Sequence, residues 1–240
     1  MKKMFWITKK SVFALLLTLL FSSTASAALI METYSSDVAI PDTIGGYSMT
    51  DFAVVNDTLS GGTSTVDSPL GGQLTFKRKN GSDLQMTRAL ADSTSWWNNG
   101  ESADYDIFTT GVPWIEVLLP ENTRAFSFSV GADLSSTGNN AWLVANESLG
   151  SGISKHRFNV NRNNTPGFGI YAANAASGEC SAITSVIIDP DYWGLGNFSI
   201  NQDDCSVSVP EPSIVALMGM GLVGLVLMRR RVKDDSSLVC

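Results

Sequence analysis

The clearest fold signal in the sequence is RAFSFSV, residues 124–130. Phe126 and Phe128 alternate with Ser127 and Ser129, and this period of two residues is typical of a half-buried strand. The phenylalanines are expected to face a core and the serines to lie on the opposite side. The segment therefore predicts a β-strand whose two faces differ in polarity.

Other segments with strand character lie on both sides of this one. Val112–Leu119 is apolar on both faces and predicts a central strand. Asn80-Gly81 is a strong tight-turn signal because both residues tolerate a positive φ, so we expect it to join Gln73–Arg78 and Asp83–Arg88 in a hairpin. Further strands are expected at Ala141–Ala145, Lys155–Val160, Gly167–Ala172, Ala182–Ile188 and Asn197–Ile200.

These segments define the fold class that we expect. No long segment with a helical period separates them, and turn-forming residues follow each one. Many short strands with turn signals between them indicate a sandwich or a barrel. We expect an all-β ectodomain over residues 28–208, folded as a jelly-roll-like two-sheet sandwich. An N-terminal signal helix and a C-terminal transmembrane helix are expected to flank it.

The N-terminus has the order of a secretory signal peptide. Four lysines in the first ten residues precede an apolar run over Val12–Phe21 and then a stretch of small residues. Ala25 and Ala27 suit signal peptidase, so we expect cleavage after Ala27 and a signal peptide over residues 1–27. The alternative is a retained N-terminal membrane helix, for which the apolar run is short.

The C-terminus carries a second membrane signal. Ser213–Met228 is uncharged and apolar. As a helix it would be roughly 24 Å long at about 1.5 Å per residue, against a bilayer core of roughly 30 Å. The three arginines that follow can snorkel to extend the span, and they keep the last residues, 234–240, in the cytoplasm. They are Arg229, Arg230 and Arg231. The alternative is a buried core helix.

Directly before this apolar run stands Val209-Pro210-Glu211-Pro212. The prolines prevent the helix from extending upstream, so we expect an extended and accessible hinge. The order of this motif, a glycine-rich apolar segment and terminal arginines resembles the PEP-CTERM sorting domain. The resemblance covers residues 209–233.

The resemblance implies a route through the cell. In that family an exosortase, an integral-membrane cysteine protease, processes the tail near the motif in Gram-negative bacteria that make exopolysaccharide. The implied precursor is anchored in the inner membrane, and the mature protein is at the cell envelope, on the surface or extracellular. The alternative is a plain single-span membrane protein.

The charge of the chain is concentrated in the expected ectodomain. Eight of the 16 basic residues and two of the 23 acidic residues lie in residues 1–27 and 213–240. The remainder, 8 basic and 21 acidic residues, carries a net charge of −13 between these ends. Such a surface repels nucleic acid and anionic lipid, so nucleic-acid binding is excluded.

Two cysteines lie in the expected ectodomain, Cys180 and Cys205. In an oxidising compartment this pair predicts a disulfide, with two free thiols as the alternative. Closure of that loop would stabilise the fold by about 3 kcal/mol in the chain-entropy model.

Metal binding is expected only as a structural calcium ion, and no other cofactor is expected. One histidine and two cysteines cannot form a zinc site. Calcium prefers loop carboxylates, but these aspartates also suit ordinary solvated turns. The candidate pairs are Asp104 with Asp106, Asp189 with Asp191, and Asp203 with Asp204.

Catalysis has weak support in the sequence, so we expect a protein that is not an enzyme. His156 is the only histidine, and no serine lies in a nucleophile elbow. Glu116 interrupts an apolar strand and could serve a glycoside hydrolase together with a second carboxylate. No partner acid can be named from the sequence.

Trp96 and Trp97 lie beside a turn and are candidates for stacking on sugar rings. The alternative is that one of them closes the end of the core. Together with the sorting signals, this favours an exported, non-catalytic protein associated with exopolysaccharide or biofilm. A carbohydrate-active hydrolase that uses Glu116 is the alternative.

Overall fold

The computed structural model describes residues 28–55, 62–91, 94–97, 105–134, 139–149, 152–173, 181–189 and 193–203. The chain divides into two units, Met1–Cys205 and Ser206–Cys240, and every described residue belongs to the first. The predicted signal helix and transmembrane helix lie outside the described residues. Within the described ranges, the structure has no helix of the length and hydropathy that a membrane crossing requires.

The described residues form sixteen β-strands, which confirms the all-β prediction. They are β1 (Leu29–Tyr34), β2 (Thr43–Ile44), β3 (Tyr47–Ser48), β4 (Thr50–Asp51), β5 (Gly62–Thr63), β6 (Thr65–Asp67), β7 (Gln73–Lys77), β8 (Met86–Leu90), β9 (Asp106–Thr110), β10 (Ile115–Leu118), β11 (Thr123–Ala132), β12 (Asn139–Glu147), β13 (Ile153–Val160), β14 (Gly167–Ala172), β15 (Ile183–Asp189) and β16 (Trp193–Gln202).

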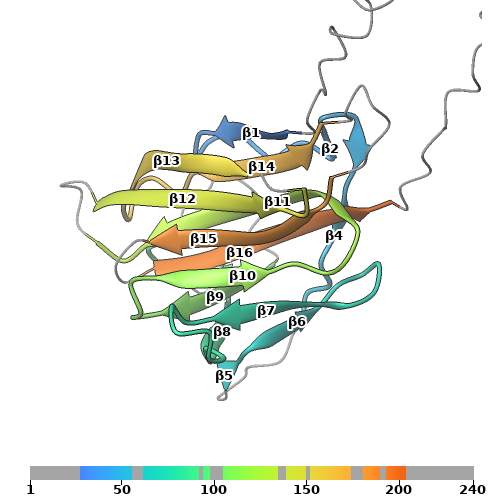
Figure 1. Ribbon diagram of the computed structural model, residues 1–240. Coiled ribbons are helices and arrows are strands. Elements are labelled where there is room, and N and C mark those ends of the chain that lie inside the picture. The colour runs from blue at the N-terminus through green and yellow to red at the C-terminus, as the bar shows by residue number, and fades with distance from the viewer. Residues whose placement is uncertain are drawn as a thin grey trace, which may run out of the picture. The chain divides into compact units, whose positions relative to one another are not determined.

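The strands form two main antiparallel sheets (Figure 1). The larger sheet has the order β1-β14-β11-β16-β9-β8-β5, and β4 pairs with β16 outside this path. The smaller sheet has the order β13-β12-β15-β10-β7-β6, and β2 and β3 form a separate hairpin. Two facing antiparallel sheets make a β-sandwich, which is consistent with the predicted jelly-roll-like architecture.

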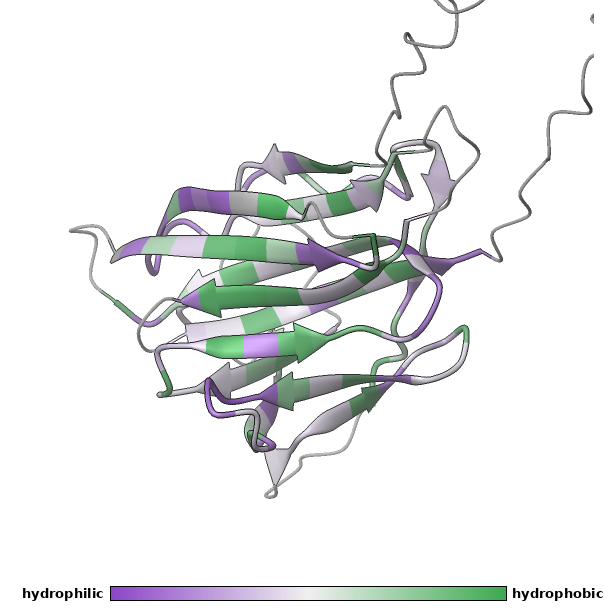
Figure 2. Cartoon of the chain, in the orientation of Figure 1, coloured by the Kyte–Doolittle hydropathy of each residue, from purple (hydrophilic) through white to green (hydrophobic). Residues whose placement is uncertain are grey.

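The main core lies between the two sheets. Phe126, Phe128 and Phe168 project from the larger sheet, and Phe76 and Leu143 project from the smaller one. All five side chains are at most 1% exposed. Figure 2 shows a hydrophilic band between hydrophobic ones on β10, and a mainly hydrophobic stretch with hydrophilic ends along β12. In the smaller sheet, inward-facing apolar residues such as Leu143 and Val186 are fully buried, whereas Trp142 on the outer face is only partly buried.

The outer face of the larger sheet is also buried, which corrects the expectation for β11. Ser127 and Ser129 are 0% and 2% exposed, although their strand alternates as a half-buried strand would. Residues 40–51, which we call the cover, lie against this face. Ile44 from the cover is fully buried, and a Cβ atom at Gly169 would lie 3.0 Å from its Cδ1 atom. Small side chains therefore leave room for a second layer.

Hydrogen bonds hold the cover on the sheet. The hydroxyl of Tyr47 donates to the carbonyl of Ala172 at 2.9 Å, and the Nδ2 atom of Asn201 donates to the carbonyl of Ser48 at 3.0 Å. Tyr47 also accepts a hydrogen bond from the buried guanidinium of Arg124 at 3.2 Å. The cover is therefore attached through both its backbone and its side chains.

The predicted hairpin over residues 73–88 is only partly correct. The turn forms as expected, because Gly81 has a φ of 82° and the amide of Arg78 donates to the carbonyl of Ser82. However, β7 pairs with β10 and β6 in the smaller sheet, whereas β8 pairs with β9 and β5 in the larger sheet. The segment after the turn therefore crosses from one sheet to the other.

Candidate functional site

A cavity lies beside an irregularity in β16 and is lined by residues of both sheets. One edge of β16 pairs with β9 over Trp193–Gly196 and with β4 at Ser199 and Ile200. Between these two ladders the register against β11 shifts, and Asn197 adopts a φ of 54°. Such a bulge bends its strand and separates the neighbours. A cavity of about 680 Å³ lies at this point.

Aromatic side chains form one wall of the cavity. The rings of Phe52 and Phe198 meet edge to face with centroids 5.8 Å apart, and the ring of Phe198 stacks on that of Phe108 at 5.6 Å. Phe198 and Phe108 belong to the main core, whereas Phe52 is only partly buried. The wall is therefore continuous with the core and stays rigid, because core side chains are close-packed.

Arg88 and Asp106 form the polar centre of the cavity. The Nε atom of Arg88 lies 4.0 Å from Oδ2 of Asp106, and the two side chains are 12% and 9% exposed. Oδ2 of Asp106 accepts a hydrogen bond from the amide of Val55 at 3.0 Å. The Nε atom of Arg88 is buried and has no hydrogen-bond partner among the described residues. The pair thus retains an unsatisfied donor, which is unfavourable in a buried position.

Further polar groups line the mouth. The Nε2 atom of Gln73 donates to Oδ1 of Asp67 at 2.7 Å, and both residues are exposed. Asp51 lies at the cavity as well, and burial raises the pKa of its carboxyl, with a smaller contribution from the charge of Asp42. The cavity therefore contains one basic and three acidic side chains, and the last of the acids is Asp106.

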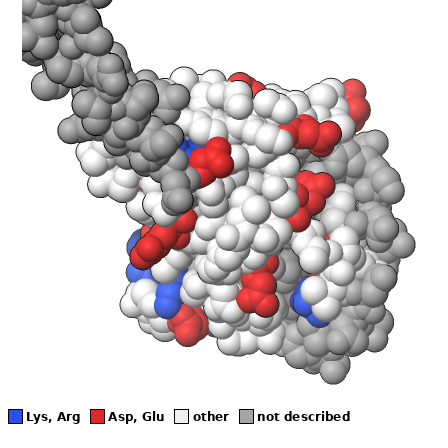
Figure 3. Space-filling view, turned by 90° about the vertical axis from the view of Figure 1, so that its right-hand side faces the viewer, with Lys and Arg blue, Asp and Glu red and all other residues white. Residues whose placement is uncertain are grey.

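The wider surface shares this acidic character. Figure 3 shows one face, on which carboxylates are scattered among uncharged side chains and outnumber the basic groups. The excess of acids in the cavity agrees with the net charge of −13 between residues 28 and 212. Electrostatic repulsion would therefore disfavour anionic ligands relative to neutral or cationic ones.

Trp97, one of the two candidate sugar-stacking residues, is largely buried in the structure. Trp97 is 8% exposed and packs in a small cluster with Ala91 and Ile107. Its Nε1 atom donates to the hydroxyl of Tyr105 at 2.6 Å, and Tyr105 lines the cavity. Trp96 is partly buried against this cluster. Trp97 therefore supports a residue of the cavity and has no open ring face for stacking.

Only one aspartate of each candidate calcium pair lies among the described residues. Asp106 faces Arg88, a cation that would oppose a second positive charge. Asp189 lies at the end of β15 opposite Trp142 and is partly buried. In the described part of the chain, no three histidine, cysteine or acidic side chains lie close enough to hold a metal ion. Asp104, Asp191 and Asp204 lie outside the described residues, and Asp203 is the last described residue of the ectodomain.

The two catalytic candidates lie elsewhere in the sandwich. Glu116 is on the outer face of the smaller sheet, opposite Lys77 on β7, and accepts a hydrogen bond from the hydroxyl of Ser185 at 2.7 Å. His156 is partly buried on β13, and its ring meets that of Phe168 edge to face at 6.2 Å. Neither residue lines the cavity.

The remaining predicted site residues lie outside the described residues. These are the cleavage site at Ala25 and Ala27, the cysteines Cys180 and Cys205, the motif Val209–Pro212 and the arginines Arg229, Arg230 and Arg231. The signal peptide and the disulfide therefore stay predictions.

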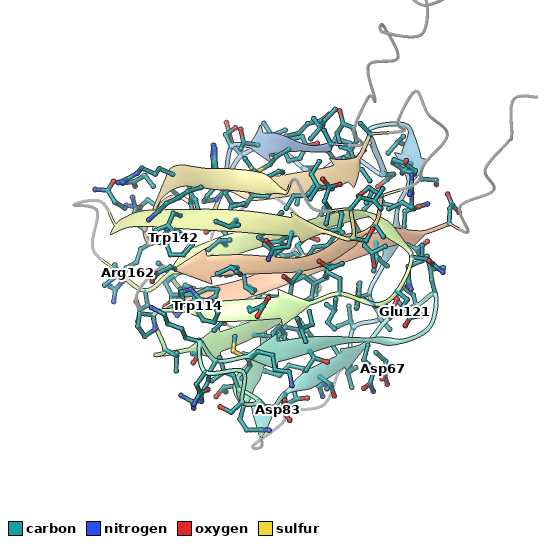
Figure 4. The ribbon with its side chains drawn as sticks, viewed as in Figure 1. Asp67, Asp83, Trp114, Glu121, Trp142 and Arg162 are labelled. Carbon is teal, nitrogen blue, oxygen red and sulfur yellow. The ribbon has the colours of Figure 1, made fainter. Side chains whose placement is uncertain are left out.

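Apart from Asp106, which was a calcium candidate, the residues of the cavity were not predicted from the sequence as site residues. Asp51, Phe52, Asp67 and Arg88 come from different segments, and β4 and β6 are only two and three residues long. Figure 4 shows Asp67 at one end of the smaller sheet, far from Trp114 and Trp142 at the opposite end. The aromatic residue Phe52, next to the short strand β4, is a local feature of the sequence at this cavity, but it indicates a binding site only weakly.

Comparisons with known proteins give one specific result. A family model for the PEP-CTERM protein-sorting motif matches residues 208–231. No curated protein matches the sequence. Among solved structures, the chain is similar to a "Xylan-Binding Domain from CBM 22, formally x6b domain", with 12% identity and a TM-score of 0.20 over 57% of this chain and 95% of that one. This TM-score is too low to inform on fold or ligand.

The matched segment contains the motif and the arginines that carried the resemblance. It begins one residue before Val209 and ends at Arg231. The prediction of a sorting motif is therefore confirmed. In the sequence, the motif follows β16 after a short interval, so the described sandwich precedes it. The chain therefore carries a PEP-CTERM protein-sorting motif at residues 208–231.

Proposed function

We propose that this protein is exported, anchored briefly in the inner membrane of a Gram-negative bacterium, and processed by an exosortase. Its mature β-sandwich then associates with extracellular polysaccharide of the envelope or the biofilm without catalysing a reaction. The observation that carries this proposal is the sorting motif at residues 208–231. Signal peptidase and the exosortase are the partners during export.

A structural role for Glu116 supports a non-catalytic sandwich. The Nδ2 atom of Asn146 donates to the hydroxyl of Ser185, which in turn donates to Oε1 of Glu116. This chain of hydrogen bonds connects β12, β15 and β10 across the smaller sheet. It gives the carboxylate a role in holding three strands together, as is common for polar side chains on a sheet face.

The intact mass of the mature protein tests the proposed export and processing by the exosortase. The protein is isolated from the envelope and the medium of a host with its exosortase and of a mutant without it. We expect loss of residues 1–27 and a truncation near Pro210–Pro212 that depends on the exosortase. A mass lower by two hydrogens would also establish the disulfide of Cys180 and Cys205. Retention of residues 213–240 in both strains would contradict the proposal.

Two further measurements test the function itself. The mature protein should co-sediment with polysaccharide isolated from the matrix of the same host, and it should release no reducing sugar from it. Reducing-sugar release that disappears in Glu116→Gln would favour a hydrolase instead. Equal sedimentation with and without the polysaccharide would contradict the association.

A further inference from the structure

We propose that the cavity between β4 and β9 binds an uncharged, hydroxyl-rich saccharide, with Phe52 as the stacking ring and Arg88 and Asp106 as the polar anchor. The inference rests on the proposed association with polysaccharide and gives it a place and a ligand class. The cavity volume of about 680 Å³ lies within the range of small-molecule sites, about 300–1,000 Å³.

The apolar wall suits a sugar ring. Phe52 is partly buried and held edge to face on Phe198, so one edge of its ring is fixed by the core. Its remaining surface lines the cavity. A pyranose presents carbon-bound hydrogens on its faces, and aromatic rings stack against such surfaces. A peptide or a nucleotide would use the same wall, so the polar groups must decide between ligands.

The polar anchor supplies a donor and an acceptor side by side. The Nε atom of Arg88 is buried and lies 4.0 Å from Oδ2 of Asp106, which is longer than a hydrogen bond. A sugar hydroxyl between them would accept from Arg88 and donate to Asp106. Only a group that is both donor and acceptor satisfies the two partners at once, and a hydroxyl is such a group. Binding would therefore relieve the unsatisfied donor.

The mouth of the cavity offers further hydrogen-bonding groups for sugar hydroxyls. The carboxylate of Asp67 and the amide of Gln73 are already held together by a hydrogen bond of 2.7 Å. Planar amides and carboxylates form paired hydrogen bonds with vicinal hydroxyls, so a fixed pair of them needs little ordering when a ligand binds. Asn197 at the bulge adds a second amide to the lining.

Charge excludes acidic sugars. Three carboxylates and one guanidinium give the cavity a net negative charge, and the surrounding domain is strongly acidic. Uronates, sulfated sugars and phosphates would be repelled from such a site. The preference for uncharged sugars over uronates is thus the sharpest consequence of the proposal. A cationic peptide would also be attracted, and the test includes one.

Calorimetry on the full-length protein in detergent tests the cavity. The probes are cellohexaose, xylohexaose and laminarihexaose as neutral chains, a galacturonate hexamer as the anion, and hexalysine as the cation. We expect at least one neutral chain to bind and the galacturonate hexamer not to bind. Arg88→Gln and Gln73→Ala should each weaken binding about tenfold or more, because each leaves a polar partner without its hydrogen bond.

Matched variants separate binding from folding. Gln73 is exposed, so Gln73→Ala should melt like the wild type, and it keeps the test valid if Arg88→Gln unfolds. Asp83→Asn removes a carboxylate that pairs with Lys77 outside the cavity, and it should not change binding. The double variant Asp51→Asn with Asp67→Asn should raise the affinity for galacturonate relative to the neutral chain.

Four results would overturn the proposal. These are absence of binding to all three neutral chains, unchanged binding in Gln73→Ala and Arg88→Gln alike, tighter binding of galacturonate to the wild type, and tighter binding of hexalysine than of any saccharide. Normal exosortase processing without saccharide binding would refute the cavity assignment and leave the sorting route standing. Saccharide binding without processing would do the reverse.

Discussion

The outer faces of the two sheets differ sharply, although both sheets are built from alternating strands. On the larger sheet, Ser127, Ser129 and Gly131 are buried beneath other parts of the chain. On the smaller sheet, Trp142 is only partly buried, and the ammonium group of Lys155 lies 4.2 Å from its ring centroid. One face thus serves as a second packing surface, whereas the other faces solvent.

Side-chain size accounts for the difference. Serine and glycine have small side chains or none, so the side chains of Ile40 and Ile44 and the ring of Trp97 approach the larger sheet closely. On the smaller sheet, the longer side chains of Trp142 and Lys155 extend further from the backbone and interact with each other. A polar residue in an alternating strand therefore does not by itself indicate solvent. Its size decides whether another layer can cover it.

The largest expected effect comes from Arg124, which joins the cover to the loop before β15. It is 2% exposed, donates to the carbonyl of Ser181 and to the hydroxyl of Tyr47, and lies 5.8 Å from the Tyr47 ring centroid. Arg124→Met should lower the free energy of unfolding by about 3 kcal/mol, because buried polar partners lose their donor.

Urea denaturation measures this loss, and Arg157→Met is the control. Arg157 is exposed on β13, so its replacement should change the free energy by less than about 0.5 kcal/mol. Equal losses in the two variants would mean that the outer faces do not differ as described.

The next largest effect is expected at Gly131. A Cβ atom there would lie 2.6 Å from Cε3 of Trp97. Gly131→Ala should destabilise the protein by about 1–3 kcal/mol, as overpacking does. It should also change the tryptophan fluorescence of the folded state. Gly111→Ala, where a Cβ atom meets nothing within 4 Å, should leave both unchanged.

A smaller effect is expected from the buried serine pair of the larger sheet. The hydroxyls of Ser127 and Ser199 share a hydrogen bond between β11 and β16. Ser127→Ala should cost about 1 kcal/mol, because Ser199 loses its partner. The double variant Ser127→Ala with Ser199→Ala should cost less than the sum of the single changes. Thermal melts measure this, with the exposed Thr184→Ala of the smaller sheet as a neutral control. An additive double variant would contradict the pairing.

The smallest effect concerns charge within the cover. The pKa of Asp51 is raised from its ordinary value of 3.8 by burial and by Asp42. A raised pKa in the folded state means that stability is lost as pH rises through it, so the ionised Asp51 is unfavourable at pH 7. Asp51→Asn should therefore stabilise the protein at pH 7 by less than about 1 kcal/mol.

The stabilisation by Asp51→Asn should vanish below pH 3.8, where Asp51 is protonated in both the folded and the unfolded chain. Melting curves across this range measure it. Asp133→Asn serves as the control, since Asp133 pairs with Arg162 at the surface and its loss brings no stabilisation. A gain that persists in acid would show that desolvation and Asp42 are not its cause.

The sequence predicted the second half of the sandwich well. The segments expected at 112–119, 141–145, 155–160, 167–172 and 182–188 all overlap strands of the structure. These strands are long enough for the alternation to be visible. β2 to β6 are two or three residues long, so their periodicity cannot be recognised. The turn at Asn80-Gly81 was predicted because it is local, but the sheet that each flanking strand joins depends on distant partners.

The contacts within the candidate site are made between residues that lie far apart in the sequence. Asp106 was singled out from the sequence, but its neighbour Arg88 follows only from the register of β8 against β9, which places Leu90 opposite Asp106. Trp97 was singled out as well, but its hydrogen bond to Tyr105, eight positions further along the chain, has no signature in the sequence. The sorting motif was predictable because it is a linear signal that requires no fold.

The position of β16 has a consequence for when the fold can form. β16 is the last strand of the described residues, yet it is a central strand of the larger sheet, between β11 on one side and β9 and β4 on the other. A chain that emerges from a membrane channel N-terminus first exposes those three strand edges until residue 202 has passed. Non-local pairing of this kind is slow. The polypeptide would therefore remain open for almost the whole of its passage and close only as the sorting motif arrives.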